Sequence, residues 1–325
     1  MKIFTSVVIG LGAIGQGYDY DHEGNDLILT HAAGLFHHPG YDLIASVDPS
    51  PVQRDRFARK YRRPCYENLD TLFSAHRPEV ISLAVPTQLH FPVFKEAMAC
   101  GPRAVLCEKP IATNTNEARE MVSLAESKSC ALLVNYLRRF DPGAIDLNKI
   151  LKDDVIGSLY KINVWYSKGL VSNGSHYLDL LLFLLGEVAH VQILDRGRLW
   201  ADSDPEPDLL IRIGEIPVYF LALREECFSF GEIVFWGTKG MVRYAERGRV
   251  IEIQEAAPDP FFSGYKMLQK EKKTVPSDLG RALWHVLDAL YGHLTLQSII
   301  NSDGKSATDT LAVIEQCTGL LGGKP

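Results

Sequence analysis

A short apolar segment near the start of the chain runs directly into a glycine-rich turn, and this arrangement constrains the fold more than any other feature. Residues 4–9 are mostly apolar, as expected of a parallel strand covered on both faces, and Gly10-Leu11-Gly12-Ala13-Ile14-Gly15 follows at once. In such a strand–turn–helix unit, the first glycine permits the tight turn, the second lets the backbone approach a pyrophosphate, and the third allows close packing. The helix that follows would present its free N–H groups to the phosphates. The motif therefore predicts a dinucleotide-binding first domain.

A second predicted strand, residues 43–47, ends in Asp48 and strengthens this interpretation. A carboxylate at that position accepts hydrogen bonds from the ribose hydroxyls and repels a 2′-phosphate, so it predicts NAD and makes NADP the less favoured cofactor. Asp48 lies 33 positions after Gly15, whereas the usual gap is about 20. The excess is the polar, acidic segment 18–29. It could be a lid or part of a substrate site, or equally a solvated surface loop.

The pattern of strands and helices changes once along the chain. Up to residue 140, short apolar runs alternate with helical patterns, which predicts an α/β Rossmann domain, a doubly wound parallel sheet with helices on both faces. After it, several strand-like runs separated by glycines predict an α+β domain with a mostly antiparallel open sheet. We therefore expect an NAD(P)-binding domain over 1–140 and a substrate-binding and oligomerisation domain over 141–325. The polar stretch 269–276 is expected to be a mobile loop.

Composition narrows the classes of partner. The chain has 325 residues and a net charge of −6, so electrostatics favour neither nucleic acid nor an anionic membrane as a partner. The longest apolar run, 177–185, is short and contains Asp179, so no transmembrane helix is expected. The first residues lead into the glycine motif without a cleavage-type site, which predicts a strand and no signal peptide. Six scattered cysteines show no metal-binding spacing and predict free thiols in a cytoplasmic protein that holds no metal.

With these features placed, the chain resembles the Gfo/Idh/MocA oxidoreductases, the family of glucose–fructose oxidoreductase and inositol dehydrogenase. The likeness covers the first domain and the start of the second, and it weakens after about residue 190. Its most specific parts are Glu-Lys-Pro at the end of a strand and a later Gly-x-His-x-x-Asp. The matching residues are the glycine motif, Val47-Asp48-Pro49, Pro86-Thr87 with His90, Glu108-Lys109-Pro110, Tyr136 with Arg138-Arg139-Phe140, and Asn173-Gly174-Ser175-His176-Tyr177-Leu178-Asp179.

Two residues are the candidate catalytic groups. Lys109 follows a parallel strand, at the edge where open α/β sheets bind ligands, and a partly desolvated lysine beside a positively charged nicotinamide has a lowered pKa suited to proton transfer. The resemblance implies that Lys109 hydrogen-bonds the reacting oxygen and that His176 contacts the substrate hydroxyl and shares the proton transfer. We expect the two to converge on one alcohol oxygen, and the Lys109–Pro110 bond to be cis. An ordinary surface lysine and a helix-start histidine bonded to backbone are the alternatives.

The chain departs from the family pattern at one position. Many relatives carry an aspartate four residues before the histidine, where this chain has Ser172, followed by Asn173. A serine or an asparagine can hydrogen-bond a sugar hydroxyl but cannot act as a base near neutral pH. This departure counts against an inositol-dehydrogenase-like activity and favours the sugar and nucleotide-sugar enzymes of the family.

Further contacts follow from the same motifs. Phe235 and Trp236 are neighbours on one predicted strand and point to opposite faces, so an aromatic can face outward there, as can Trp165 on its own strand. Such an apolar outer face predicts a homodimer or homotetramer formed through the C-terminal sheet; the equally weighted alternative is that these aromatics belong to the core. The remaining cofactor candidates are Pro86, Thr87, His90 and Glu108, and the substrate candidates are Tyr136, Arg139, Lys168, Ser172, Asn173 and Asp179.

Three functions are compatible with these residues. The first is an NAD(P)-dependent dehydrogenase or ketoreductase that acts on a secondary alcohol or ketone of a sugar, nucleotide sugar or polyol. The second is a dinucleotide-binding sensor on the same scaffold without catalysis. The third is a reductase of another substrate, such as a bilin or an imine. Because both Lys109 and His176 are present, the sequence favours the enzyme with a sugar-like substrate.

Overall fold

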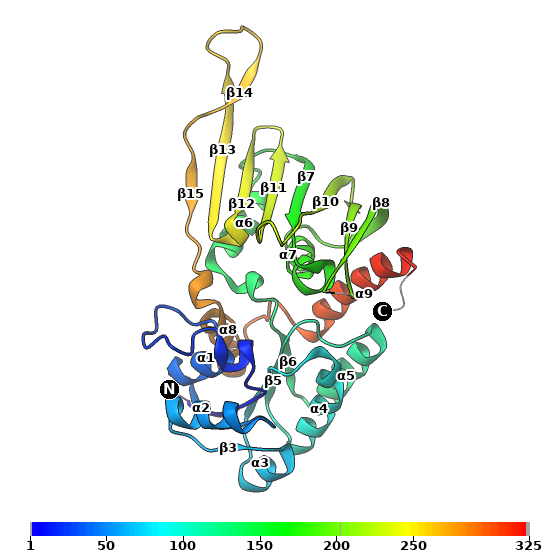
Figure 1. Cartoon of the computed structure of the whole chain (residues 1–325). Coiled ribbons are helices and arrows are strands. Elements are labelled where there is room, and N and C mark those ends of the chain that lie inside the picture. Colours follow the sequence, from blue (N-terminus) through cyan, green and yellow to red (C-terminus); the bar gives the residue numbers. More distant parts are fainter. Residues whose placement is uncertain (1, 202, 323–325) are drawn as a thin grey trace. The chain divides into compact units, whose positions relative to one another are not determined.

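The computed structural model describes residues 2–201 and 203–322, and the chain forms two compact units (Figure 1). The first unit contains the residues up to Phe140 together with Gly280–Leu311. The second contains Asp141–Leu279 together with residues that follow Leu311.

The first unit is built on a six-stranded parallel sheet in the order β3-β2-β1-β4-β5-β6. This is the order of a doubly wound nucleotide-binding sheet, and it confirms the predicted fold class. Apart from the two-residue edge strand β3, the strands are largely buried and apolar because helices cover both faces of the sheet. They are β1 (Phe4–Ile9), β2 (Tyr41–Val47), β3 (Cys65–Tyr66), β4 (Val80–Leu83), β5 (Ala104–Cys107) and β6 (Ala131–Val134).

Two apolar clusters lie on the two faces of this sheet. One contains side chains from α1, α2 and α8, and the other contains side chains from α3, α4, α5 and the start of α9. α1, α3 and α5 begin at Thr30, Asn68 and Asn114, whose side chains each accept a hydrogen bond from a backbone N–H of the first turn. The helices are α1 (His31–His37), α2 (Pro51–Tyr61), α3 (Leu69–Ala75), α4 (His90–Ala97), α5 (Thr115–Ser127), α8 (Ala282–Leu296) and α9 (Gly304–Leu320).

The two units divide the chain differently from the predicted domains at the C-terminal side. The predicted second domain takes in all of 141–325, whereas residues 280–311 contact the first unit. The physical reason is apolar burial, because Leu283 and Leu287 of α8 are fully buried in the cluster that contains Phe4 and Val8 of β1. The boundary after Phe140 coincides with the predicted one.

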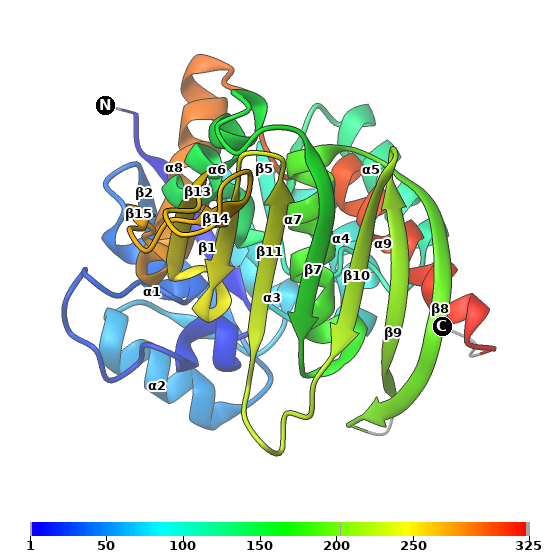
Figure 2. The same cartoon turned by 90° about the horizontal axis from the view of Figure 1, so that it is seen from above.

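The second unit contains a nine-stranded sheet that is mostly antiparallel, with one parallel pair between β7 and β10 (Figure 2). The helices α6 (Pro142–Lys152) and α7 (Ser175–Leu185) pack on one face of it. The strands run in the order β14-β13-β12-β11-β7-β10-β9-β8, with β15 beside β13. They are β7 (Leu159–Tyr166), β8 (Val188–Trp200), β9 (Asp204–Ile213), β10 (Ile216–Ala222), β11 (Gly231–Gly237), β12 (Gly240–Ala245), β13 (Val250–Pro258), β14 (Lys266–Leu268) and β15 (Lys273–Val275).

One sequence prediction for this unit is wrong. The stretch 269–276 was expected to be a mobile loop, but Lys273–Val275 forms strand β15, which pairs with β13. Lys273 and Thr274 are exposed and only Val275 is buried, so pairing with a long neighbouring strand gives β15 order that local composition does not reveal. The prediction that Phe235 and Trp236 face opposite sides of the sheet agrees with their burial, since Phe235 is fully buried and Trp236 is partly exposed.

No helix within residues 2–201 and 203–322 combines the length and the apolar character that a membrane crossing requires.

Candidate functional site

The glycine turn after β1 has the geometry that its three glycines predict. Gly10 has a φ of +93°, and a Cβ on it would lie 2.5 Å from the carbonyl oxygen of Ala84. A Cβ on Gly15 would collide with the carbonyl oxygen of Gly10. Around Gly12, by contrast, no heavy atom would come within 4 Å of a Cβ. The backbone at Gly12 is therefore open to a ligand, as a pyrophosphate cradle requires.

The segment after the turn differs from the prediction of a helix that starts at once. Only a single π-helical turn, η1 (Ala13–Gly17), follows the glycines, and α1 begins at His31. Between these two helices, the carboxylate of Asp19 accepts hydrogen bonds from Leu29 N (2.7 Å) and Thr30 N (2.9 Å), so it joins the beginning of the intervening segment to its end. Segment 18–29 is thus an insertion closed at its base by one buried aspartate.

The insertion is also tied to α2. The amine of Lys60 donates to the carbonyl oxygens of Asp19 (2.9 Å) and His22 (3.1 Å), and the ring of Tyr20 lies 4.0 Å below the guanidinium of Arg56. Ile28 is fully buried at the far end of the insertion. Of the two interpretations left open for this segment, a loose solvated loop fits these contacts poorly, because both of its ends are anchored.

Asp48 lies at the carboxyl end of β2, beside the glycine turn. Its Oδ2 accepts a hydrogen bond from Leu11 N (2.7 Å) and its Oδ1 accepts one from Ser50 N (2.8 Å), and the residue is only 9% exposed. Each oxygen keeps a second lone pair, which suits a ribose hydroxyl. Arg54 donates through Nη1 to the carbonyl oxygens of Asp48 (2.9 Å) and Pro49 (2.7 Å). An acid and an arginine therefore lie together at this strand end.

Glu108, which follows β5, is held in a buried polar network. Its Oε1 lies 2.8 Å from Nε2 of His31 on α1 and accepts a hydrogen bond from Nδ2 of Asn135 after β6 (2.5 Å). His31 Nδ1 in turn lies 2.5 Å from Oγ of Ser82 on β4. The other carboxylate oxygen accepts a hydrogen bond from the backbone N–H of Lys109 (3.2 Å). The network thus joins α1 and three strands under the backbone of the candidate catalytic lysine.

The charge state of Glu108 follows from these partners. Burial by itself would raise the pKa of this carboxyl, but the hydrogen bonds from His31 and Asn135 and the positive charge of Lys109 outweigh burial, so its pKa lies below the ordinary value. Glu108 is therefore an ionised carboxylate held by His31, Asn135 and the backbone N–H of Lys109. Through the last of these contacts it supports the backbone of Lys109.

His90, another predicted cofactor residue, is fully buried at the start of α4. Its Nδ1 lies 2.8 Å from the carbonyl oxygen of Pro110, and its Nε2 lies 2.9 Å from that of Val85. Burial lowers the pKa of this histidine, although the two carbonyls oppose the effect. Both ring nitrogens face backbone oxygens, so the side chain links the loops after β4 and β5.

The open edge of the first unit is formed by other predicted residues. Pro86 is exposed and Thr87 is partly exposed at the start of η2 (Thr87–Leu89), directly after β4. Lys109 is partly exposed after β5, and the Lys109–Pro110 bond is cis, as expected. Because β1, β4 and β5 are adjacent and parallel, the glycine turn, Thr87 and Lys109 follow the carboxyl ends of neighbouring strands.

Tyr136 and Arg139, predicted to contact the substrate, lie deep in the first unit. Both are buried after β6. Nη1 of Arg139 donates to the carbonyl oxygen of Asn301 (3.0 Å), and Nδ2 of Asn301 donates back to the carbonyl oxygen of Arg139 (3.3 Å). The contacts of Arg139 thus hold the loop that precedes α9.

In the second unit the predicted residues lie on or beside one short segment. Ser172 and Asn173 belong to the π-helical turn η5 (Gly169–Gly174), which runs into α7, and His176 is partly exposed in the first turn of α7. Asp179, one turn further on, is fully buried. Nδ2 of Asn173 donates to the carbonyl oxygen of Ser167 (2.8 Å). The predicted anion contact Lys168 pairs instead with Glu225 (3.3 Å).

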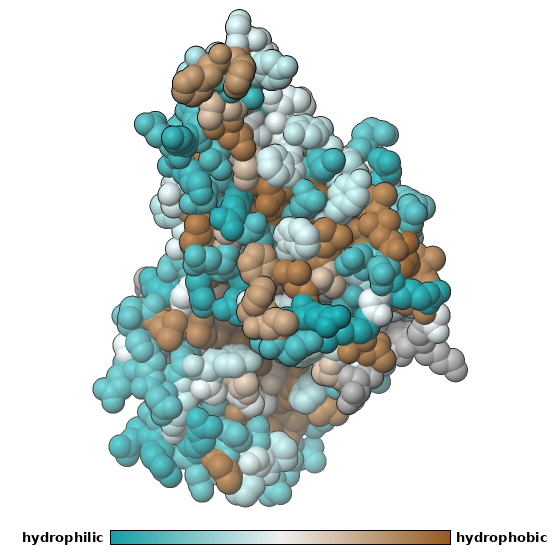
Figure 3. Space-filling view, turned by 45° about the horizontal axis from the view of Figure 1, so that its top comes forward, coloured by the Kyte–Doolittle hydropathy of each residue, from teal (hydrophilic) through white to brown (hydrophobic). Residues whose placement is uncertain are grey.

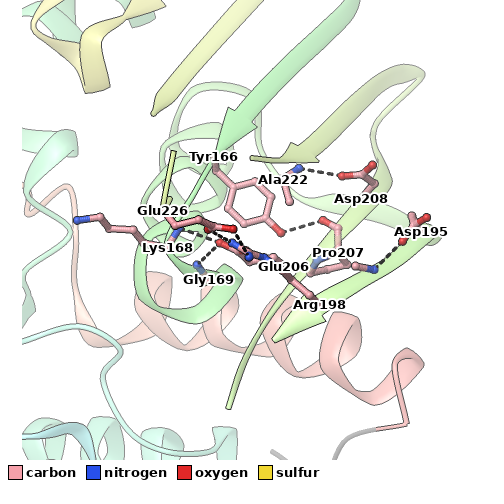
Figure 4. Close-up of polar contacts among 11 residues, drawn as sticks. Tyr166, Lys168, Gly169, Asp195, Arg198, Glu206, Pro207, Asp208, Ala222 and Glu226 are labelled. Carbon is pink, nitrogen blue, oxygen red and sulfur yellow. Dashed lines mark hydrogen bonds and ion pairs between the residues drawn. The ribbon is translucent and has the colours of Figure 1, made fainter. Parts of the chain in front are cut away.

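Two buried acids on β9, Asp204 and Glu206, hold this segment, and sequence reasoning missed both. The contacts of Glu206 are drawn in Figure 4. Glu206 Oε1 accepts hydrogen bonds from the backbone N–H groups of Lys168 (3.0 Å) and Gly169 (3.2 Å), and its Oε2 accepts one from Nε of Arg198 (2.9 Å). Asp204 accepts hydrogen bonds from Val171 N (2.8 Å) and Ser172 N (2.7 Å). The available signal was the alternation of acids at 204, 206 and 208, which is typical of one face of a strand.

The first unit thus has the parts of a dinucleotide site. A glycine turn with an open backbone and an acid at the end of the next strand are the features by which Rossmann folds bind a dinucleotide. The residues present therefore fit an NAD(P) cofactor, with Gly12 beside the phosphates and Asp48 beside a ribose.

Comparisons with known proteins agree with this class. Residues 4–136 match a family described as an oxidoreductase family with an NAD-binding Rossmann fold. The chain is 27% identical over 277 residues to the 2,7-anhydro-N-acetylneuraminate hydratase of Escherichia coli K12, a match that covers 77% of this chain and 69% of that protein. The inositol 2-dehydrogenase of Rubrobacter xylanophilus is 26% identical over 168 residues, which cover 51% of this chain and 46% of that enzyme.

Solved structures extend the likeness to both units. The WlbA dehydrogenase of Bordetella pertussis, in complex with NADH and UDP-GlcNAcA, superposes with a TM-score of 0.78 at 18% identity over 99% of this chain and 96% of that one. The resemblance of the motifs to the Gfo/Idh/MocA oxidoreductases is thus confirmed for residues 4–136, which match that family's NAD-binding Rossmann domain, and the chain as a whole shares the fold of the WlbA dehydrogenase.

Proposed function

We propose that this protein transfers a hydride between the nicotinamide of NAD and a secondary alcohol or ketone of a sugar or nucleotide sugar, with a polyol as a further possible substrate. The observation that carries this proposal is the position of Lys109. Lys109 follows the carboxyl end of β5. This strand pairs with β4, and β4 pairs with β1, which leads into the glycine turn. The buried carboxylate of Glu108 accepts a hydrogen bond from the backbone N–H of Lys109 and so supports it. The names of the related enzymes support a sugar-like substrate.

The proposed roles of the residues follow from their chemistry. In the oxidising direction the hydride leaves the carbinol carbon for NAD, while the proton of the hydroxyl passes to the amine of Lys109. His176 is proposed as the second proton-handling group and as a contact of the substrate hydroxyl. Ser172 and Asn173 can hydrogen-bond a sugar hydroxyl, but neither can act as a base near neutral pH. The proposed pair is therefore Lys109 and His176, without the aspartate of a Lys/Asp/His arrangement.

NAD is proposed over NADP because of Asp48. A 2′-phosphate would bring negative charge beside a buried carboxylate, and that repulsion is strong where water is scarce. Arg54 offers little compensation, because its Nη1 is bonded to two backbone carbonyl oxygens. A titration in which NADP bound more tightly than NAD would overturn this part of the proposal.

The catalytic proposal is tested with a panel of sugars and nucleotide sugars. The wild type and Lys109→Ala are assayed at 340 nm for NADH, with Lys95→Ala, an exposed-helix lysine of the same unit, as the matched control. We expect Lys109→Ala to lower kcat by about 100-fold or more while NAD affinity is nearly kept, because general acid–base catalysis contributes about 10²–10⁴-fold. Tight NAD binding without turnover of any substrate would instead favour a dinucleotide-binding sensor without catalysis.

One relative supplies a second candidate outcome. The Escherichia coli protein is named a hydratase, so its name describes the addition of water and no net oxidation. The reactions of the panel are therefore monitored by mass spectrometry of the substrate as well as by absorbance. A mass gain of water without net NADH, lost in Lys109→Ala, would assign a hydratase reaction; a mass loss of two hydrogens with NADH formation supports the dehydrogenase.

Two further parts of the proposal concern the setting of the enzyme. We propose a homo-oligomer formed through the second unit, because partly exposed Trp165, Tyr219 and Trp236 lie on the sheet face opposite the buried core. A cytoplasmic location is proposed on the basis of the six free thiols, of which Cys227 is exposed. Mass measurement in solution tests the first, and localisation of a tagged chain tests the second.

A further inference from the structure

A buried chain of polar side chains in the first unit leads to the backbone of Lys109, and two of its members, His31 and Ser82, take no part in the proposed mechanism. Hydrophilic side chains cover much of the face that Figure 3 shows, as is usual for polar groups. Ser82 on β4 and His31 on α1 are, by contrast, fully buried, and Glu108 is only 9% exposed. Burial of polar groups is unfavourable unless each finds a partner, so the partners of these three residues indicate what the chain contributes.

The hydrogen bonds of this chain have a defined direction. An ionised carboxylate can only accept hydrogen bonds, so Nε2 of His31, which lies 2.8 Å from Oε1 of Glu108, carries a proton. On the other side of the ring, Nδ1 lies 2.5 Å from Oγ of Ser82, whose hydroxyl can donate to it. Oε2 of Glu108 accepts a hydrogen bond from the backbone N–H of Lys109 (3.2 Å). Ser82 therefore holds the ring of His31, and His31 holds the carboxylate beside Lys109.

A serine, a histidine and a carboxylate in this order also form the triad of hydrolytic enzymes. In such a triad the serine hydroxyl must reach the substrate, but Ser82 is fully buried on a strand that lies between β1 and β5 in the sheet. Of the three side chains, only that of Glu108 belongs to a residue with any exposure. The chain is therefore directed at Lys109 and not at a substrate of Ser82.

The charges of Glu108 and Lys109 influence each other. Burial raises the pKa of Glu108, but the hydrogen bond and charge of His31, the hydrogen bond from Asn135 and the charge of Lys109 together bring this pKa below its ordinary value. Attraction between two charges acts on both partners. The carboxylate of Glu108 therefore favours the protonated form of the Lys109 amine.

Two further titratable groups beside Glu108 add no charge near neutral pH. Burial raises the pKa of the Cys107 thiol well above its ordinary value. Burial also lowers the pKa of His90 on α4, and the backbone carbonyls beside its ring oppose this effect only in part. Because both groups are neutral, the electrostatic effect of Glu108 on Lys109 depends on how strongly His31 binds the carboxylate.

We propose that His31 is a positioning residue that, through Glu108, sets the pH at which the amine of Lys109 releases its proton. The N–H of His31 offsets part of the negative charge of the carboxylate, and the remaining charge holds the proton on the amine. The inference rests on the proposed function for its effect on turnover, since the amine must give up the proton in one direction and take it up in the other. The amine can nevertheless be titrated without any substrate, so the two proposals can fail separately.

The test measures the pH at which the Lys109 amine is half deprotonated. A trace of acetic anhydride labels the folded protein over a pH series, and mass spectrometry of the peptide that contains Lys109 gives this midpoint. Glu108→Gln removes the charge with little change of shape and should lower the midpoint by about one pH unit. His31→Leu removes the N–H donor and leaves the carboxylate, so the midpoint should rise. His31→Gln keeps a donor and should stay near the wild-type midpoint, as should His37→Gln, the matched control at a partly exposed position of α1.

The double variant decides whether His31 acts through Glu108. Adding His31→Leu to Glu108→Gln should leave the midpoint of Glu108→Gln unchanged, because the group that transmits the effect is gone. A shift from His31→Leu that persists in the double variant would overturn the proposal. The same holds if both single variants move the midpoint in the same direction, as a loosened site would cause. Thermal unfolding identifies a variant that folds poorly, and Ser82→Ala, which releases only the ring of His31, then replaces His31→Leu with the same expected direction.

Turnover separates this inference from the proposed function. If both hold, the pH profile of kcat for alcohol oxidation shifts with the labelling midpoint in each variant. Shifted midpoints in a protein that turns over no substrate would support this inference and reject the proposed function. Normal turnover with the wild-type midpoint in Glu108→Gln and in His31→Leu would overturn this inference and leave the proposed function standing.

Discussion

At the scale of single residues, the buried, ionised side chain of Glu108 depends most strongly on its hydrogen-bonding partners. Removing a carboxylate from water is costly unless hydrogen bonds and charge replace the lost hydration. His31, Asn135 and the N–H of Lys109 provide that replacement. Sequence reasoning placed Glu108 and Lys109 correctly at the end of a strand, but nothing in the spacing connects residue 31 with residue 108. That contact exists only once α1 packs on the sheet.

His31→Ala should therefore destabilise the protein by about 3 kcal/mol, since it leaves a buried charge without its main partner. Because the folded pKa of Glu108 lies below its ordinary value of 4.5, the carboxylate stabilises the fold fully above that pH, and its contribution is lost as pH falls through the folded pKa. Urea unfolding at pH 7 and at pH 4 measures the difference. Glu108→Gln should flatten the pH dependence and keep more stability at neutral pH than His31→Ala does.

A second prediction at this scale concerns cofactor choice. Asp48→Ala removes the acceptor of Leu11 N and the carboxylate proposed to bind the ribose, so NAD affinity should fall by about tenfold or more. NADP affinity should fall less, because the repelling charge is gone as well. Isothermal titration with both cofactors measures the ratio, and Asp55→Ala, an exposed acid on α2, is the control. An unchanged NAD affinity would refute the assignment of Asp48.

At the scale of elements, the first unit was the more predictable. Its strands are apolar runs bounded by turns, and β1 begins and ends at the predicted residues. In the second unit, the outer parts of β8 and β9 are polar and are ordered by pairing with each other. β15 was missed for the same reason. Local pattern cannot reveal order that depends on a distant partner strand.

The segment before His176 gives the prediction for this scale. Asp204→Ala leaves Val171 N and Ser172 N without their acceptor, which should loosen η5 and raise KM for the substrate by about tenfold, as charge-assisted hydrogen bonds contribute about 1.5–3 kcal/mol. NAD affinity should not change, because the glycine turn and Asp48 belong to the first unit. Asp195→Ala, on β8, is the matched control. Equal effects on substrate and NAD would indicate general unfolding instead.

At the scale of the whole molecule, the main feature is that residues 280–311 belong to the first unit although they follow most of the second unit in the sequence. The sequence does not reveal the unit to which α8 belongs, because the apolar face of a helix does not specify its partner. Leu287→Ala removes a fully buried side chain of α8 and should cost about 3 kcal/mol, whereas Leu296→Ala, 78% exposed on the same helix, should cost almost nothing. Thermal unfolding, recorded with and without NAD, measures the stability of both variants. Equal losses of stability in the two variants would contradict this packing.

The same return has a consequence during synthesis. A ribosome that has released only the first 279 residues holds a sheet whose α1 face still lacks the side chains of Leu283, Val286, Leu287 and Leu290. The nucleotide-binding half of the enzyme begins translation first yet finishes folding late, after the whole intervening unit has emerged. Nascent chains stalled in that interval should expose the uncovered face to chaperones and acquire NAD binding only once α8 is available.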